Sequence, residues 1–236
     1  MVRIRVAVVC LERRGFFKKL VEKDKRLVID NRKPEAVIAF GGDGTLLYAE
    51  KLYPQVTKLF IYHSGPSNKI SMKCYQEVME DFVAKKYSLT GYTKIEGSVN
   101  GKKLIGLNDI NIAYTPPSAL RFDVYVSNKL VALGCIGDGI VVATPYGSTA
   151  HFFSVTRKSF SKGLGIAFNN TMKPVKNLIL PENSKIRVVI TRGPGVMSTD
   201  SNKNVIILKS GDVIHIRKHG MAAKLLKIRG KTKVRI

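Results

Sequence analysis

The sequence predicts an α/β N-terminal domain built on a Rossmann-like parallel sheet, followed by an all-β sandwich. Apolar runs and helical periods alternate in the first third of the chain, whereas short strand-like segments separated by turns fill the region after Tyr87. The 236 residues, 44% of them hydrophobic, suffice for two domains with cores of their own. We assign 1–89 to the α/β domain, 90–220 to the β-rich domain, and 221–236 to a C-terminal tail that could pack back on the first domain.

The elements of the first domain follow from their hydrophobic periods. Buried strands are expected at Arg3–Cys10, Arg26–Asp30, Ala36–Phe40 and Leu59–Tyr62. One helical face carries Phe16, Phe17, Leu20 and Val21, and a later one carries Met72, Tyr75, Val78, Met79, Phe82 and Val83. A helix between them ends near Pro54. Ligands of such domains bind beyond the carboxyl ends of the strands.

The second domain carries alternating patterns and turn signals. Asn100-Gly101 marks a hairpin, and Arg121–Val126 alternates strictly between two faces. Ser127-Asn128 then turns the chain into another strand. Further strands are expected at Lys129–Leu133, Ile140–Ala143, Lys185–Thr191, Asn204–Leu208 and Val213–Arg217.

A formal net charge of +23 is the main anomaly of the composition. It fits a polyanionic ligand such as a dinucleotide, a nucleoside triphosphate or polyphosphate, and it fits nucleic acid or a generally basic surface equally well. The apolar run Val6–Leu11 is too short for a membrane span or a signal peptide, so we expect a cytoplasmic protein. Three widely spaced cysteines, Cys10, Cys74 and Cys135, are expected to be buried thiols.

Residues Gly41–Leu47 read GGDGTLL directly after a predicted buried strand. Glycines let backbone N–H groups face an anion, and Thr45 is expected to cap a helix that begins at Leu46. A carboxylate aimed at phosphate, here Asp43, requires a neutralising metal ion or a hydroxyl proton to accept. Both alternatives are typical of a kinase site, although an Asp-Gly pair after a strand is also an ordinary turn signal.

A second Gly-Asp-Gly turn opens the segment Gly137–His151, GDGIVVATPYGSTAH. Ser148 and Thr149 are good caps for a helix that starts nearby, and a helix N-terminus attracts an anionic or polar ligand. A capped helix without a ligand would explain these two residues equally simply, but it leaves Asp138 unexplained.

Asn108-Asp109 interrupts two apolar segments, Leu104–Leu107 and Ile110–Tyr114. An Asn side chain matches the donor and acceptor edge of adenine, and Asp109 could accept hydrogen bonds from ribose hydroxyls. A simple β-turn is the competing explanation.

These three segments, in this order, resemble those of the NAD kinase family, with the strongest stretch at Arg121–His151. GGDGT alone also occurs in diacylglycerol and sphingosine kinases. The resemblance implies transfer of a phosphate from ATP or polyphosphate to the 2′-hydroxyl of the adenosine ribose of NAD. It also implies an N-terminal α/β domain, a C-terminal β-sandwich, and a homodimer or homotetramer.

Carried over by position, the resemblance makes Asp43 the catalytic residue that accepts or orients the 2′-hydroxyl. The implied substrate-binding residues are Gly42, Gly44, Thr45, Asn108, Asp109, Asp138, Thr144, Gly147, Ser148, Thr149, Ala150, His151 and Ser154. Asp138 would lie near the nicotinamide end. Asp200 looks like the aspartate of a later family strand. No metal site made by the protein alone is expected, because Mg²⁺ would arrive with the donor phosphates.

Several positions depart from the family pattern. Asp109 replaces a more common Glu, Tyr146 a Thr, and His151 a Tyr. The glycine-rich stretch after Ser154 is replaced by Val155–Ser161. The segments Phe168–Pro174 and His63–Ile70 also differ from the usual ones. A lipid kinase that shares GGDGT, or a non-catalytic dinucleotide-binding or nucleic-acid-binding protein, therefore remain as alternatives, and a membrane partner is not expected.

Overall fold

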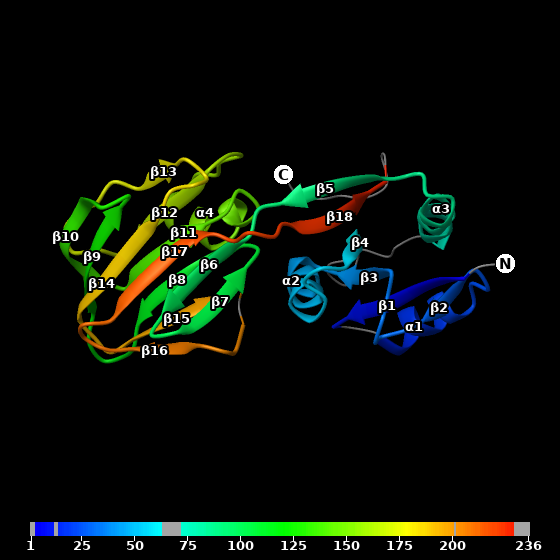
Figure 1. Cartoon of the computed structure of the whole chain (residues 1–236), viewed down its shortest axis with the longest axis horizontal. Helices are drawn as coiled ribbons and strands as arrows, with labels where there is room; N and C mark the ends of the chain where they lie inside the picture. The colour runs from blue at the N-terminus through cyan, green and yellow to red at the C-terminus, as the bar shows by residue number, and fades with distance from the viewer. Residues whose placement is uncertain (1–2, 12–13, 63–71, 201, 229–236) are drawn as a thin grey trace. The chain divides into compact units, whose positions relative to one another are not determined.

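The computed structural model describes residues 3–11, 14–62, 72–200 and 202–228, and the chain divides into two compact units (Figure 1). Unit 1 consists of 1–92 together with 223–235, and unit 2 of 93–222. The predicted domain boundaries, after residues 89 and 220, lie beside those of the units.

Unit 1 contains one six-stranded sheet in the order β2-β1-β3-β4-β18-β5. Its strands are β1 Ile4–Cys10, β2 Leu27–Ile29, β3 Ala36–Gly41, β4 Thr57–Tyr62, β5 Ser88–Tyr92 and β18 Ala223–Lys227. The strands from β2 to β18 are parallel, but β5 runs antiparallel to β18. The prediction of a parallel sheet is therefore right for five strands and wrong for the edge, because the chain enters β5 directly before it leaves this unit.

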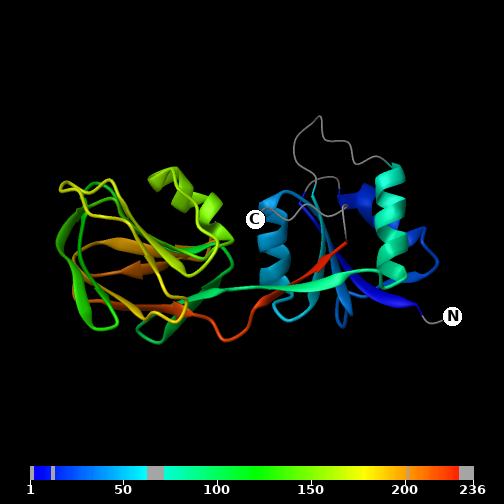
Figure 2. The ribbon, with the colours of Figure 1, turned by 90° about the horizontal axis from the view of Figure 1, so that it is seen from above.

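Three helices cover the two faces of this sheet: α1 Arg14–Glu22, α2 Asp43–Leu52 and α3 Met72–Val83. Alternate residues of the buried strands point to opposite faces. Phe17 of α1 and Met79 of α3 pack in one core with Ile38 and Phe40 of β3, whereas α2 lies on the other face. Figure 2 shows α2 and α3 on opposite sides of the sheet.

An ion pair is buried between α2 and the sheet. Lys58 of β4 is fully buried, and its ammonium group contacts the carboxylate of Glu50 and donates a hydrogen bond to the Tyr53 carbonyl at 2.6 Å. Charges of this kind are tolerated inside a protein only when they are paired and hydrogen-bonded. The pair therefore ties the C-terminal end of α2 to β4.

Unit 2 is a sandwich of two six-stranded sheets, in the orders β10-β9-β14-β17-β6-β7 and β13-β12-β11-β8-β15-β16. The first sheet contains β6 Ile95–Val99, β7 Lys102–Gly106, β9 Leu120–Val126, β10 Lys129–Gly137, β14 Ile186–Arg192 and β17 Val213–Lys218. The second contains β8 Asp109–Tyr114, β11 Gly139–Ala143, β12 Leu164–Asn169, β13 Leu178–Leu180, β15 Gly195–Thr199 and β16 Ile206–Leu208. Neighbouring strands are antiparallel throughout. The β-sandwich implied by the sequence is confirmed.

The inward-facing side chains of both sheets form one apolar core, in which the rings of Phe122 and Phe168 stack with centroids 6.5 Å apart. A short helical segment, η1 Gly147–Thr149 followed by α4 His151–Thr156, lies on the outer face of the second sheet. Phe152 of α4 packs there on Val141, Ala143 and Ala167. The segment is therefore anchored directly after the strand that carries the second glycine-aspartate turn.

Cys10 and Cys135 are buried thiols, as predicted, and the side chain of Cys74 lies outside the described residues. Within the described ranges, no helix combines the length and apolarity that crossing a bilayer would require.

Candidate nucleotide and phosphate site

The GGDG loop connects β3 to α2 in unit 1. Gly42 is the N-cap, and the helix begins at Asp43, three residues before the predicted start. The prediction that Thr45 caps the helix is wrong, because its side chain is buried and faces Gly41. A Cβ atom at Gly41, whose φ is +150°, would lie 2.2 Å from Thr45 Oγ1. Glycine at this position thus lets the strand turn closely against the first turn of the helix.

The chemistry available at this loop comes from its carboxylate and the helix N-terminus. The half-buried Asp43 occupies the first helical position, where backbone N–H groups and the helix dipole create positive potential. Gly44 beside it is exposed, and a Cβ at that residue would meet nothing within 4 Å. The loop therefore combines an acidic group with an anion-attracting helix end, and the space beside Gly44 is open.

In unit 2, the turn between β7 and β8 carries Asn108 and leads into Asp109, the first residue of β8. Both side chains are buried, with 9% and 7% of their surface exposed. The Thr199 hydroxyl donates to the Asp109 carbonyl at 2.6 Å. This is not a solvent-exposed β-turn, since the two polar residues point into protein.

Asn108 carries an unsatisfied acceptor. Its Oδ1 atom is buried and has no hydrogen-bond partner among the described residues. Leaving such an oxygen unpaired costs about 1 to 3 kcal/mol, so a native structure that retains one calls for an explanation. A ligand with an N–H donor, such as an adenine amino group, would satisfy it.

Asp109 has an unusual ionisation. Burial, and secondarily the charge of Asp200, raise the pKa of its carboxyl to about 7. A carboxylate near its pKa at neutral pH is a candidate functional group when it lies beside other polar groups. Here it is the next residue in the chain after Asn108, whose Oδ1 atom has no partner among the described residues.

Thr144 and Gly147 close the other side of this turn. The Thr144 hydroxyl donates to the Leu107 carbonyl at 2.6 Å, and the Gly147 N–H donates to that hydroxyl at 3.1 Å. A Cβ at Gly147 would lie 2.1 Å from the carbonyl oxygen of Asn108. The structure thus brings Asn108, Asp109, Thr144 and Gly147 together, as the sequence suggested.

The predicted capping roles of Ser148 and Thr149 are wrong. Neither η1 nor α4 has a side-chain cap among the described residues, and the buried Ser148 hydroxyl lies 2.8 Å from the Pro145 carbonyl and 2.9 Å from that of Phe160. Thr149 and Ala150 are exposed at the start of α4. Ser148 is therefore a structural residue, whereas the next two present their side chains to solvent.

His151 and Ser154 lie on α4. His151 is half-buried, and its burial lowers the pKa of the imidazole. The exposed Ser154 donates its hydroxyl proton to the His151 carbonyl at 2.7 Å. The helix ends at Thr156 because Arg157 adopts a left-handed conformation, with φ of 57°. Glycine usually occupies such a left-handed position after a helix. Arg157 stands there in this chain, within the stretch Val155–Ser161 that lacks the glycines of the family pattern.

Asp138 is not close to Thr144 and the Asn-Asp turn, although all of them belong to unit 2. It precedes β11, whereas Thr144 follows that strand, so the two lie at opposite ends and about 20 Å apart at ~3.3 Å per residue. Asp138 Oδ2 accepts a hydrogen bond from Asn170 at 3.1 Å. The second glycine-aspartate turn and the Asn-Asp turn therefore lie at opposite ends of β11.

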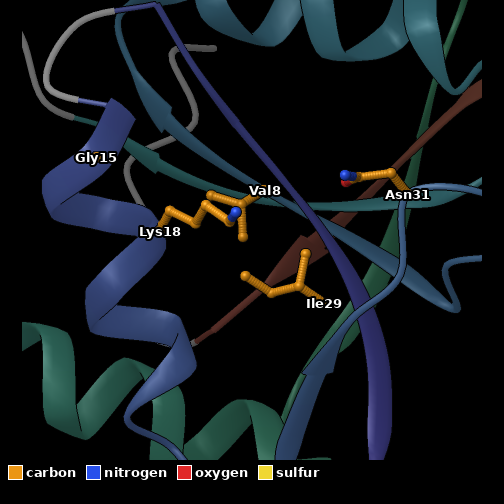
Figure 3. Close-up of a pocket in the computed structure, with 5 residues that line it drawn as sticks. All are labelled: Val8, Gly15, Lys18, Ile29 and Asn31. Carbon is orange, nitrogen blue, oxygen red and sulfur yellow. The ribbon is translucent and has the colours of Figure 1, made fainter.

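A separate cavity of about 270 Å³ lies in unit 1, between α1 and the strands β1 and β2 (Figure 3). It is lined by Val8, Gly15, Lys18, Ile29 and Asn31. None of these residues was predicted for the site, and none belongs to the GGDG loop. The Lys18 Nζ atom also forms an ion pair with Glu22 Oε1, at 3.6 Å, one turn further along α1.

Magnesium can be tested against the available oxygen ligands. Over the described ranges, no group of three His, Cys, Asp or Glu side chains could hold a metal ion. Asp43 offers a carboxylate beside open space, and Mg²⁺ is often held by one or two carboxylates together with substrate phosphates. The residues therefore fit a magnesium ion that is delivered with a phosphate donor.

Comparison with known proteins shows which family this chain resembles. Residues 107–228 match the ATP-NAD kinase C-terminal domain. The NAD kinase of Sulfurisphaera tokodaii is 27% identical over 79% of this chain and 73% of its own length. That of Moorella thermoacetica is 27% identical over 84% of this chain and 68% of its own length.

Two solved structures share the fold. Yeast NADH kinase in complex with NADH aligns over 96% of this chain and 84% of its own, with a TM-score of 0.82 and 17% identity. An NAD kinase from Archaeoglobus fulgidus in complex with ATP aligns over 97% and 95%, with a TM-score of 0.76 and 19% identity.

Proposed function

The chain belongs to the NAD kinase family, and from this premise we propose how it transfers a phosphate group from ATP to the 2′-hydroxyl of the adenosine ribose of NAD. The observation that carries the proposal is the unpaired Oδ1 atom of the buried Asn108, next to Asp109. An adenine amino group would supply the missing donor, and the Asp109 carboxylate would accept hydrogen bonds from ribose hydroxyls.

The adenosine would lie against the turn that Asn108 shares with Thr144 and Gly147. Thr149 and Ala150 are exposed at the start of α4, and His151 and Ser154 follow on that helix. These residues are suited to contact the nucleotide. Asp138 stays a prediction for the nicotinamide end, and its distance from Thr144 agrees with the extended shape of a dinucleotide.

Phosphate transfer depends mainly on positioning and on neutralising charge. Asp43 would accept the 2′-hydroxyl proton or orient that oxygen, while the N–H groups at the start of α2 face the donor phosphates. Gly42, Gly44 and Thr45 belong to the same loop. Mg²⁺, held by the donor phosphates and Asp43, would neutralise phosphate charge when bound.

Polyphosphate is a second candidate donor, because a net charge of +23 favours any polyanion. The fold neighbour from Archaeoglobus fulgidus was solved with ATP, which supports ATP as the first choice. We further propose that the protein works in the cytoplasm as a homodimer or homotetramer.

The decisive experiment is a coupled assay for NADP formation from purified protein, with NAD and magnesium and with ATP or polyphosphate in parallel. Product with at least one donor is the expected result. A second set of reactions without magnesium should give little product. If no donor yields NADP although NAD binds, the protein is a non-catalytic dinucleotide binder.

The family match decides between the two enzyme alternatives in favour of NAD, because lipid kinases share only the GGDGT loop. A parallel assay with diacylglycerol and sphingosine should therefore yield no phosphorylated lipid. Nucleic-acid binding would appear instead as RNA affinity that falls steeply with salt.

A further inference from the structure

Every backbone polar group of the turn residues Leu107 and Asn108 has a partner. Their N–H groups donate to the two carboxylate oxygens of Asp200, at 2.6 and 2.7 Å. Their carbonyls accept from the Thr144 hydroxyl at 2.6 Å and the Thr144 N–H at 2.8 Å. The turn is thus held from two sides, by the residue after β15 and by the residue after β11.

This arrangement accounts for the free oxygen of Asn108. Because both backbone N–H groups of the turn already donate to Asp200, neither is available to the Asn108 side chain. Asn108 Oδ1 is thus left without a partner among the described residues. A carboxylate that receives two backbone N–H groups forms strong, charge-assisted hydrogen bonds. The orientation of Asn108 therefore depends on Asp200, which lies 92 residues further along the chain.

We propose that Asp200 is a positioning residue of the nucleotide site, whose carboxylate holds the 107–108 turn so that Asn108 Oδ1 faces the adenine and Asp109 faces the ribose. The inference rests on the proposed NAD kinase function. Asp200 does not need to touch the substrate for this role, since it acts through the backbone of the turn.

The negative charge of Asp200 is unfavourable for the neighbouring Asp109, which supports a specific positioning role for Asp200. It places a second negative charge near the buried Asp109 and thereby contributes to the raised pKa of that residue. Among the described residues, Asp200 is the charged group that acts on Asp109. It also adopts a left-handed backbone with φ of 49°, which Asp and Asn tolerate better than most residues. A neutral side chain would relieve the repulsion but would lose the paired N–H acceptors.

The test is Asp200→Asn, which keeps the size and the backbone preference but can accept only with one atom. We expect the NAD dissociation constant and the KM for NAD to rise at least about tenfold, while kcat changes less than about threefold. The acid limb of kcat/KM for NAD should also move to lower pH, because Asp109 loses its like-charged neighbour.

Asp212→Asn is the matched control. Asp212 also uses its carboxylate in a turn of unit 2, accepting from the Lys209 N–H at 2.7 Å and from Asn100 at 2.8 Å. A general loss of a turn contact would affect both variants alike. We expect Asp212→Asn to leave the KM for NAD and the pH profile unchanged.

The proposal is overturned if Asp200→Asn binds NAD and titrates like the wild type. If that variant does not fold, Thr144→Val removes the hydroxyl that donates to the Leu107 carbonyl and keeps the backbone N–H that donates to the Asn108 carbonyl. An unchanged KM for NAD in this variant would also overturn the proposal. Failure of the wild type to bind NAD at all would instead overturn the proposed function. Calorimetric NAD binding by the wild type separates the two failures.

Discussion

At the scale of single residues, Asn108 and Asp109 each have a buried polar group that the packing of the protein does not explain. Asn108 keeps a buried oxygen unpaired, and Asp109 keeps a carboxyl buried with a pKa of about 7. Both arrangements destabilise the unliganded protein. A bound nucleotide would offset them, which makes them informative about function.

Asp43→Asn is the direct test of the phosphate-transfer step. General-base assistance typically contributes about 10² to 10⁴ in rate, so turnover should fall at least about 100-fold. The asparagine can still occupy the first position of α2, and the fold should therefore be retained. Steady-state NADP formation and circular dichroism measure the two effects, and a variant with nearly normal turnover would make Asp43 a turn residue.

Asp109→Asn tests the buried carboxyl through the pH dependence of stability. The pKa of Asp109 is higher in the folded protein than in the unfolded chain, so the folded state binds the proton more tightly. The contribution of this proton to the unfolding free energy is fully present below pH ~4 and is lost as pH rises through ~7. Between these two pH values the unfolding free energy falls by about 1.4 kcal/mol per pH unit.

Wild-type protein should therefore gain unfolding free energy, relative to Asp109→Asn, when pH is lowered from 8 to 5. Urea unfolding monitored at several pH values measures the difference. The same substitution should weaken NAD binding. Parallel pH profiles of the two proteins would show that Asp109 does not titrate as described.

At the scale of elements, the site is made where strands end. β3 leads into the GGDG loop, and β11 and β15 end beside the turn that precedes β8. Glycines permit the closest approaches: Gly41 faces Thr45, and Gly147 faces the Asn108 carbonyl. These contacts fix the geometry of two polar turns, and within the described part of the chain neither α2 nor η1 has a side-chain cap.

Gly147→Ala tests this close packing. The added Cβ would lie 2.1 Å from the carbonyl oxygen of Asn108, so the turn or η1 must move. We expect a loss of about 1 to 3 kcal/mol in unfolding free energy, as is typical of overpacking, together with weaker NAD binding. Gly220→Ala is the control in the same unit, because its Cβ would meet nothing within 4 Å. Equal stability of the two variants would contradict the packing argument.

At the scale of the whole molecule, the chain builds unit 1 from both of its ends. β18, at 223–227, pairs with β4 on one side and with β5 on the other. It therefore connects β5, at the edge, to the rest of the sheet. Leu226 and Ile228 enter the same core as Phe40. The stability of unit 1 therefore depends on residues from two stretches that are far apart in the sequence.

Truncation after Ala222 should destabilise unit 1 selectively. The deletion removes the strand between β4 and β5 and leaves the residues of unit 2 intact. Hydrogen exchange should show lost protection in β4 and β5 but retained protection in β9 and β14. Uniform protection in both units would show that β18 is dispensable.

Sequence reasoning proposed most of the candidate site from three short local motifs. GGDG after an apolar strand, Asn-Asp between two strands, and the TPYGSTA segment were recognisable by residue type and spacing alone. It also placed most strands, whose alternation is a local property. It did not predict β5, β12, β13 or β18 as strands. β13 has only three residues and β18 carries two lysines among its five, but β12 is a buried apolar strand that the sequence analysis missed.

The sequence by itself thus predicted which groups would carry the chemistry, and it determined that the chain combines an α/β part with a β-sandwich. Only the tertiary structure decided that Asp200 holds the Asn108 turn, that Thr45 and Ser148 are structural, and that Asp138 lies far from Thr144. The physical reason is range. Residue type and periodicity are local signals, whereas a hydrogen bond between residues 92 positions apart exists only after strands from distant parts of the chain have paired.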